Sequence, residues 1–476
     1  MTAAIEDAEC EAGRGFEILH LCGGQLDTMG RLFASRLTTQ FTWRSLLARQ
    51  GVTRAEMDAF RDARLREIVR HAWEQVPYYR RMFEQQGVRA SDIRCVADLS
   101  ALPILSKKDL QALPAADITA RGLDPDGLIP HLTSGSTGRT VTIRRTWFEE
   151  RWLNAFRRRA ERTFGQRPMD RLVCVGLDRP LDPRNDRLPQ RILRGPGLQG
   201  MSILDCRQPV RTLVRQLCEL QPDVLSGFAA VVWRIAMVAT DAERKLIRPR
   251  FVHTGGEVLT SPMRRRIAEA LDAPVYDVYG SHEFNIIAWE CTQTGDYHTC
   301  DDLLLVEVLH NGRPVAPGQR GEVVATSLHS FAMPIIRFRL GDRVTKGEAQ
   351  CACGQPFSTI RAIEGRMTDH FPLPDGRVVH PYELVTLILA NAPWIQEYRL
   401  VQEQADLVVL HVVALAGPSP EELALVCGLV SRQLGPTVRF EVALESEIPI
   451  DPSGKTRVFR SLVESNYDSL NWSASR

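Results

Sequence analysis

From residue 130 to about residue 280, two kinds of hydrophobic pattern alternate along the chain. Short apolar runs of strand length are separated by stretches in which apolar residues recur every three to four positions, the period of a helix. The expected strands are 172–175, 224–226, 251–253 and 275–278. The expected helices are 210–220, 231–240 and 262–271. This alternation predicts an α/β fold in which helices cover a sheet.

The pattern differs on either side of this region. Residues 53–87 are helical in period, whereas residues 1–45 show no clear period. Residues 303–344 read as strands with turn signals at Asn311-Gly312 and Pro317-Gly318. The last hundred residues contain a separate pattern. Its expected helices are 384–390 and 420–434, and its expected strands are 398–401, 407–413 and 438–442. We therefore expect a large multi-layered α/β domain followed by a small α+β domain.

Length and composition narrow the possibilities. A chain of 476 residues is too long for one compact core. The net charge of +1 gives no general reason to bind nucleic acid or a membrane surface, and Arg157–Arg159 and Arg264–Arg266 read as solvated helix faces. No apolar run approaches the roughly 20 residues of a membrane span, and the acidic N-terminus lacks a signal-peptide pattern. Eleven scattered cysteines favour a reducing, cytoplasmic setting.

A run of small and hydroxyl residues lies between two strand-like segments, 129–133 and 141–145. The run consists of Thr133, Ser134, Gly135, Ser136, Thr137 and Gly138. Glycines allow backbone N–H groups to approach a polyphosphate, and hydroxyls add donors. The spacing is not that of a Walker loop. Taken alone, the run is better explained as an ordinary flexible hairpin.

Four distant motifs favour the phosphate-binding interpretation over the hairpin, although each motif is weak evidence alone. They are Gly255-Gly256-Glu257, Tyr279-Gly280-Ser281-His282-Glu283, Gly341-Asp342 with Gly365-Arg366, and Pro452-Ser453-Gly454-Lys455. The alternatives are a core aromatic for Tyr279, a first-turn acid for Glu283, a common turn for Asp342 and a surface lysine for Lys455. The order and spacing of all the motifs resemble those of the adenylate-forming enzymes, and most closely the phenylacetate–CoA ligase branch.

The resemblance implies activation of a carboxylic acid with ATP to an acyl-AMP, followed by acyl transfer to an acceptor. Residues 133–138 would hold the phosphates, although Arg139 and Thr140 replace the usual lysine and proline. Gly255, Gly256 and Glu257 would line one side of the adenine, and Tyr279, followed by Gly280 and Ser281, would stack on the other. Asp342 would bind the ribose, Arg366 the ribose or phosphate, and Glu283 the Mg²⁺.

The resemblance also implies roles for the small domain and the acid. Lys455 would enter the site during adenylation, and the chain would pivot at Asp369, which separates domains 1–368 and 369–476. Ser226, Gly227, Phe228 and Ala229 would line the acyl site, with a helix cap as the alternative for Ser226. His282 is a candidate for acid recognition, with a structural imidazole as the alternative. An aromatic acid is expected.

CoA is the default acceptor. Transfer to form an amide or ester, adenylyl transfer to a cofactor hydroxyl, and a non-catalytic protein with a decayed site remain alternatives. The small-molecule partners are therefore ATP, an acid and CoA or another acceptor, and a homodimer is common among such ligases.

Cys291, His298, Cys351 and Cys353 form a Cys…His…Cys-x-Cys pattern. Three cysteine sulfurs and one imidazole suit a closed, structural Zn²⁺ site. The resemblance implies the same, since some members of the branch carry a similar site. Cys300 is a spare that could replace one ligand, and unrelated thiols are the alternative reading.

Overall fold

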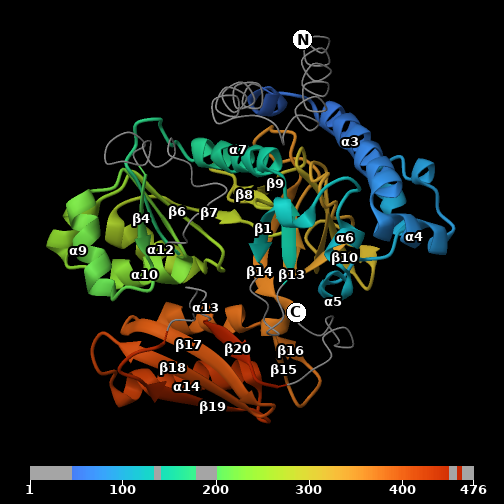
Figure 1. Cartoon of the computed structure of the whole chain (residues 1–476). Coiled ribbons are helices and arrows are strands. Elements are labelled where there is room, and N and C mark those ends of the chain that lie inside the picture. The colour runs from blue at the N-terminus through green and yellow to red at the C-terminus, as the bar shows by residue number, and fades with distance from the viewer. Residues whose placement is uncertain (1–44, 133–140, 178–200, 450–457, 464–476) are drawn as a thin grey trace.

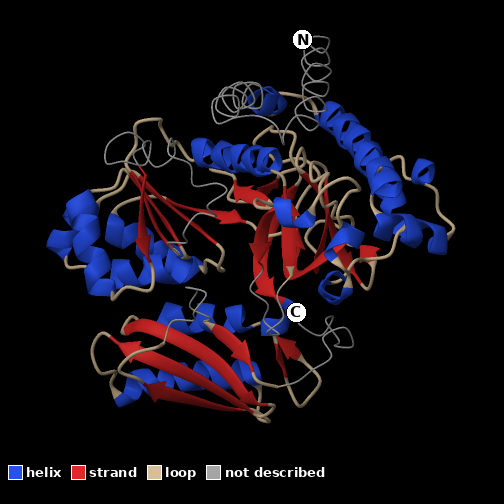
Figure 2. Ribbon diagram, viewed as in Figure 1, coloured by secondary structure: helices blue, strands red, loops and turns tan. Residues whose placement is uncertain are grey.

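The computed structural model describes residues 45–132, 141–177, 201–449 and 458–463 (Figure 1). A large unit built around one long sheet lies above a smaller unit formed by the C-terminal part of the chain (Figures 1 and 2). Within the described residues, none of the helices combines the length and the apolar character that a membrane crossing requires.

The large sheet has twelve strands in the order β11-β10-β12-β13-β14-β9-β8-β7-β6-β5-β3-β4. Five neighbouring strands are parallel: β3 (Leu172–Gly176), β4 (Met201–Asp205), β5 (Val224–Gly227), β6 (Phe251–Gly255) and β7 (Val275–Tyr279). The others pair antiparallel: β8 (Ala288–Glu290), β9 (Tyr297–Thr299), β10 (Leu304–His310), β11 (Arg313–Pro314), β12 (Arg320–Ser327), β13 (Phe338–Lys346) and β14 (Thr359–Arg366). A separate hairpin joins β1 (Ile129–Leu132) to β2 (Thr142–Arg145). The predicted α/β class is confirmed.

Helices cover this sheet (Figure 2). They are α7 (Trp147–Thr163), α9 (Val210–Leu220), α10 (Ala229–Val238), α11 (Asp241–Ile247) and α12 (Ser261–Leu271). The helices predicted at 210–220 and 262–271 agree closely, and the one predicted at 231–240 begins two residues earlier. Sequence reasoning missed α7, although Thr146 and Glu149 form a capping box at its start.

The helical segment predicted at 53–87 is two helices, α3 (Arg54–Gln75) and α4 (Pro77–Gln86). The break falls at Val76, which is extended at φ −112° and ψ 114° because it precedes a proline. A capping box from Thr53 starts α3, and Gly87 ends α4 in the left-handed conformation. The short helices α5 (Lys107–Ala112) and α6 (Ala115–Ile118) follow, with 3₁₀ turns at 90–92, 96–101 and 125–127.

The interpretation of the two arginine clusters as solvated helix faces was wrong in part. Arg159 is buried and makes two hydrogen bonds to the buried Asp302, of 2.6 and 2.8 Å. Arg264 pairs with Glu290 at 2.8 Å, and Arg266 donates to a carbonyl of the small unit. Their partners lie far away in the sequence, so the local pattern could not show that these charges are compensated.

The small unit follows the 3₁₀ turn η4 (Met367–Asp369) and opens with the hairpin of β15 (Phe371–Pro372) and β16 (Val378–Val379). Its sheet has the order β19-β18-β17-β20. The strands are β17 (Ile395–Gln404), β18 (Leu407–Ala414), β19 (Arg439–Leu444) and β20 (Phe459–Ser461), and the helices are α13 (Pro381–Asn391) and α14 (Pro420–Leu434). The predicted small α+β unit is confirmed.

Two apolar cores support this arrangement. One joins α3, α4 and α7 to the antiparallel half of the large sheet. The other begins between the parallel strands and helices α9, α10 and α12, and continues without a break into α13, β17, β18 and α14. The small unit is therefore packed against the large one through buried side chains.

Candidate active site

The predicted nucleotide motifs meet where the parallel strands end. In sheets of this kind, ligands bind at the carboxyl ends of the strands, and Gly255 and Tyr279 are the last residues of the neighbouring strands β6 and β7. A Cβ added to Gly255 would lie 3.0 Å from the Val278 carbonyl oxygen, and one added to Gly280 would lie 2.3 Å from that of Asn285. Gly256 has φ +76°. The backbone here therefore requires glycine.

Tyr279, Asp342 and Arg366 lie together at this edge: Tyr279 and Asp342 are buried, whereas the Arg366 side chain is 45% exposed. The Tyr279 hydroxyl donates to Asp342 Oδ2 at 2.6 Å, and Arg366 Nε lies 3.4 Å from Asp342 Oδ1. Asp342 and Arg366 are register partners on β13 and β14. Asp342 raises the pKa of Arg366, and burial together with Asp342 raises that of Tyr279. Residues predicted to bind adenine, ribose and phosphate are thus in direct contact, although 63 residues or more separate Tyr279 from the others.

Glu283 is held beside this group through its backbone. The buried guanidinium of Arg145, on β2, donates to the carbonyls of His282 at 2.6 Å and Glu283 at 3.0 Å. Arg145 also pairs with Glu150 at 3.1 Å, as does His131 of β1 at 3.0 Å. Burial would raise the pKa of Glu150, but the bonds from His131 and Arg145 hold it at about 2.

These contacts tie the β1–β2 hairpin to the 281–283 segment. The predicted phosphate-binding residues 133–138, with Arg139 and Thr140, lie outside the described residues, as does Lys455. The strands that lead into and out of the predicted loop nevertheless belong to the same site as Glu283.

Lys107 lies near enough to Glu283 and Arg366 for their charges to act on it, and sequence reasoning did not single it out. It is half-buried at the start of α5, and its pKa is lowered by burial and by Arg366, while Glu283 opposes that shift. Leu105 holds the segment in place, because its N–H donates to the Arg337 carbonyl and its carbonyl accepts from Arg339 N–H, at 2.8 and 2.9 Å.

The predicted acyl-site residues lie at the end of β5 and the start of α10. Ser226 is buried within β5, so the alternative that it caps a helix was wrong. A Cβ on Gly227 would lie 2.9 Å from the Val175 carbonyl oxygen. Phe228 is half-buried at the position before α10, and Ala229 is the buried first residue of that helix. Gly227 on β5 is the register partner of Thr254 on β6, so this segment lies beside Gly255 at the end of β6.

The cap of α10 comes from Glu257 instead. Its carboxylate accepts from the Ala230 N–H at 2.9 Å, which satisfies one of the unpaired donors at the start of a helix. The segment predicted to line the adenine is therefore joined directly to α10. His282 is half-buried, and Arg145 positions its carbonyl.

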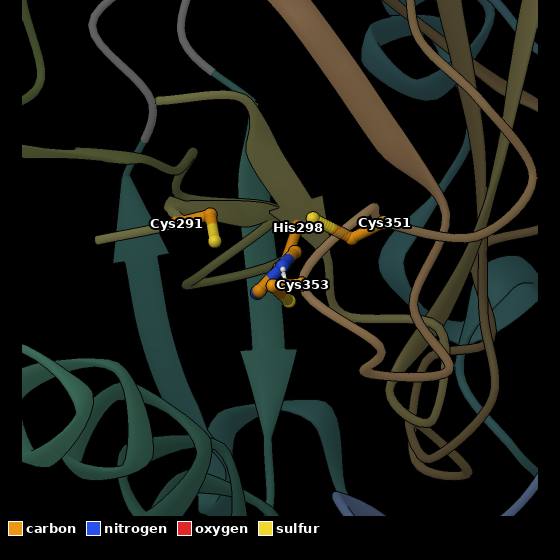
Figure 3. A group of neighbouring side chains, drawn as sticks. All are labelled: Cys291, His298, Cys351 and Cys353. Carbon is orange, nitrogen blue, oxygen red and sulfur yellow. Dashed lines mark hydrogen bonds between the residues drawn. The ribbon is translucent and has the colours of Figure 1, made fainter. Parts of the chain in front are cut away.

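The four predicted metal ligands come together in the antiparallel half of the sheet (Figure 3). The ligand atoms of Cys291, His298, Cys351 and Cys353 all lie within 4.8 Å of one another. Cys353 Sγ is 3.3 Å from His298 Nε2. A tetrahedral site with the usual zinc bond lengths puts its donors about 3.5 to 3.8 Å apart. Cys300 is not part of the cluster but lies beside Arg159, so its proposed role as a spare ligand was wrong.

Comparisons with known proteins agree with this architecture. No family model matches the chain. It is 29% identical over 336 residues to the phenylacetate–coenzyme A ligase of Escherichia coli, spanning 66% of this chain and 72% of that protein. It is 24% identical over 380 residues to the Thermus thermophilus enzyme of the same name, spanning 74% and 79%.

A solved structure of 2-hydroxyisobutyryl-CoA ligase with its acyl-AMP, in the postadenylation state, has a TM-score of 0.73 at 25% identity over 87% of this chain and 91% of that one. In its open and thioesterification states the same ligase covers the same share of this chain with TM-scores of 0.59 and 0.57. The fold and the site define an adenylate-forming enzyme. Within that superfamily, the chain is similar to enzymes named phenylacetate–coenzyme A ligases.

Proposed function

We propose that this protein is an AMP-forming acid–thiol ligase that activates an aromatic carboxylic acid and transfers it to CoA. The observation that carries the proposal is the contact of Tyr279, Asp342 and Arg366 beside Glu283, at the carboxyl ends of β6 and β7. Tyr279 supplies an aromatic face for the adenine, and Asp342 supplies a carboxylate for the ribose hydroxyls. Arg366 supplies a positive charge for a phosphate, near the carboxylate of Glu283. The relatives named as phenylacetate–coenzyme A ligases support the choice of acid and acceptor.

In the first step, a carboxylate oxygen of the acid attacks the α-phosphorus of ATP, and pyrophosphate leaves. Asp342 would hold the ribose hydroxyls and Arg366 the phosphate side, while Glu283 would hold Mg²⁺, which screens the charge of the triphosphate. Lys455 would stabilise the charge that develops between the acid and the α-phosphate. In the second step, the thiolate of CoA attacks the acyl carbonyl carbon, and AMP leaves.

This cycle requires one site to serve two reactions. We propose that residues 369–476 form the small domain and that it pivots at Asp369, in the η4 turn between β14 and β15. Closure excludes water from the acyl-AMP, and rotation then admits the acceptor. The described cysteines form no disulfide bonds with one another, and we propose a reducing, cytoplasmic location.

The test is acid-dependent exchange of labelled pyrophosphate into ATP, followed by CoA consumption with any acid that supports exchange. The panel should hold benzoates, phenylacetates and cinnamates, with 2-hydroxyisobutyrate as the aliphatic comparison. We expect exchange with one aromatic group and CoA thioester formation with the same acids. Exchange with aliphatic acids alone would contradict the aromatic assignment, and AMP retained in the product would contradict acyl transfer.

Lys107 should contribute to the first step. Its ammonium, near both Glu283 and Arg366, is placed to neutralise phosphate charge. We expect Lys107→Ala to slow pyrophosphate exchange about 10-fold or more, since a hydrogen bond to a charged group contributes roughly 1.5–3 kcal/mol. Lys108→Ala is the matched control, because Lys108 is the next residue in the chain and its side chain is exposed. Equal rates for the two variants would remove Lys107 from the site.

We also propose a structural Zn²⁺ at Cys291, His298, Cys351 and Cys353. Four protein donors leave no open position, so the metal would stabilise β8, β9 and the 351–353 turn rather than take part in the reaction. We expect Cys351→Ser to lose the metal and to melt roughly 5 °C lower or more. Cys300→Ala should keep a full equivalent of zinc. Purified wild-type protein that lacks zinc, with melting unchanged by a chelator, would contradict this site.

A further inference from the structure

The contact between the two units is built from specific polar groups as well as apolar ones. Trp233 Nε1, on α10, donates to the Gln396 carbonyl of β17 at 2.8 Å. The next residue, Arg234, donates from Nε to Glu397 Oε1 at 2.7 Å. Both charged side chains are nearly buried, at 12% and 10% exposure. We call Trp233, Arg234, Gln396 and Glu397 the interdomain clasp.

Neighbouring contacts reinforce the clasp. The Arg266 guanidinium of α12 lies 5.3 Å above the centre of the Trp233 ring and donates to the Leu389 carbonyl of α13 at 2.7 Å. The Tyr398 hydroxyl donates to Met263 Sδ at 3.5 Å. The crevice left between these surfaces is about 10 Å³, at the lower limit for one water molecule. The charged pair is therefore shielded from solvent, where a hydrogen bond between charges is strong.

The clasp is linked to both halves of the active site. Glu257, which follows the predicted adenine segment, caps the helix that carries Trp233 and Arg234. Its carboxylate also helps raise the pKa of the buried Tyr398, next to Glu397 on β17, where burial is the main cause. On the other side, β17 pairs in parallel with β20, and Leu400 N–H donates to the Val458 carbonyl at 2.8 Å. Val458 stands three residues after Lys455 in the sequence.

The arrangement that contains the clasp corresponds to one catalytic state. The postadenylation state of 2-hydroxyisobutyryl-CoA ligase matches this chain with a TM-score of 0.73, and its thioesterification state with 0.57, at equal coverage of this chain. The two states are of the same ligase, so the difference in TM-score reflects how its two domains are placed relative to each other. The contacts of α10 and α12 with β17 and α13 therefore belong to the arrangement associated with adenylation.

We propose that the interdomain clasp positions the small domain for adenylation and has to open before acyl transfer. Arg234 and Glu397 are positioning residues, since they act through the placement of the unit that carries Lys455. The kinetic test of this inference rests on the proposed function, whereas the scattering test does not. Breaking the clasp should impair the first half-reaction and leave the second intact, because the second uses a different arrangement of the two domains.

The kinetic test compares Arg234→Met and Trp233→Phe with wild type in both half-reactions. Trp233→Phe keeps an aromatic side chain but removes the N–H donor together with part of the buried indole, so it tests the hydrogen bond along with some loss of packing. We expect Arg234→Met to slow pyrophosphate exchange about 10- to 100-fold, the loss that corresponds to one charged hydrogen bond, and Trp233→Phe to slow it less. Thiolysis of supplied acyl-AMP should be unchanged or faster. Equal losses in both half-reactions, or none in either, would overturn the proposal.

Arg211→Met is the matched control. Arg211 pairs with Glu243 at 2.8 Å within the large unit, at 55% exposure, so its loss should change neither half-reaction. A second measurement does not depend on activity. X-ray scattering of the whole protein should show a larger radius of gyration for Arg234→Met than for wild type or Arg211→Met. Equal radii for all three would overturn the clasp, whereas a wild type without exchange for any acid would count only against the proposed function.

Discussion

Lys455→Ala should slow acid-dependent pyrophosphate exchange by about 100- to 1,000-fold, the usual loss when one positioned donor is removed from a developing charge. The same variant should convert supplied acyl-AMP to the CoA thioester at close to the wild-type rate. The reason is that the lysine would stabilise only the transition state in which pyrophosphate leaves.

The comparison with Lys245→Ala separates this role from a general effect of charge, because Lys245 is an exposed lysine on α11. That control should behave as wild type in both half-reactions. If Lys455→Ala lost both half-reactions equally, Lys455 would have to be assigned a structural role or a role common to the two steps.

Asp342→Ala should have the second-largest effect. The carboxylate accepts from Tyr279 and lies beside Arg366, and in the proposed complex it would hold the ribose. Two hydrogen bonds to a charged group contribute together about 3 kcal/mol or more, so kcat/KM for ATP should fall at least roughly 100-fold. The loss should appear with every acid in the panel, because the acid does not contact Asp342.

Tyr279→Phe provides the companion variant for Asp342→Ala. It removes only the hydroxyl that donates to Asp342 and keeps an aromatic ring for stacking. We expect a smaller loss, about 10-fold. Asp375→Ala is the control, since Asp375 pairs only locally with Arg377 among the contacts described. An Asp342→Ala enzyme with a normal kcat/KM for ATP would contradict the ribose role.

Much of the fold was predictable because periodicity is a local property. Four of the five parallel strands follow the predicted apolar runs, whereas β4 was not predicted, and α9 and α14 have the predicted bounds. The strand order of the twelve-stranded sheet was not predictable, because it depends on which distant strands pair. Helix α7 was missed since arginines interrupt its apolar face, and Arg159 is buried there only because Asp302 compensates its charge.

The site was predictable where a motif is formed by neighbouring residues, and less so where it depends on tertiary contacts. Tyr279, Asp342 and Arg366 were found through their motifs, and the structure brings them together. Lys107 was missed because its role depends on proximity to Glu283 and Arg366, which no sequence spacing reveals. Likewise, the alternative of a helix cap at Ser226 could not be decided from the sequence, because Glu257, from the end of another strand, caps α10.

The central claim is that this chain forms an acyl-AMP from an acid and ATP. The most direct measurement is acid-dependent exchange of labelled pyrophosphate into ATP, with wild type and Asp342→Ala in parallel. We predict exchange that requires an aromatic acid and that falls at least roughly 100-fold in the variant. ATP binding without exchange for any acid, in the presence or absence of CoA, would contradict the account.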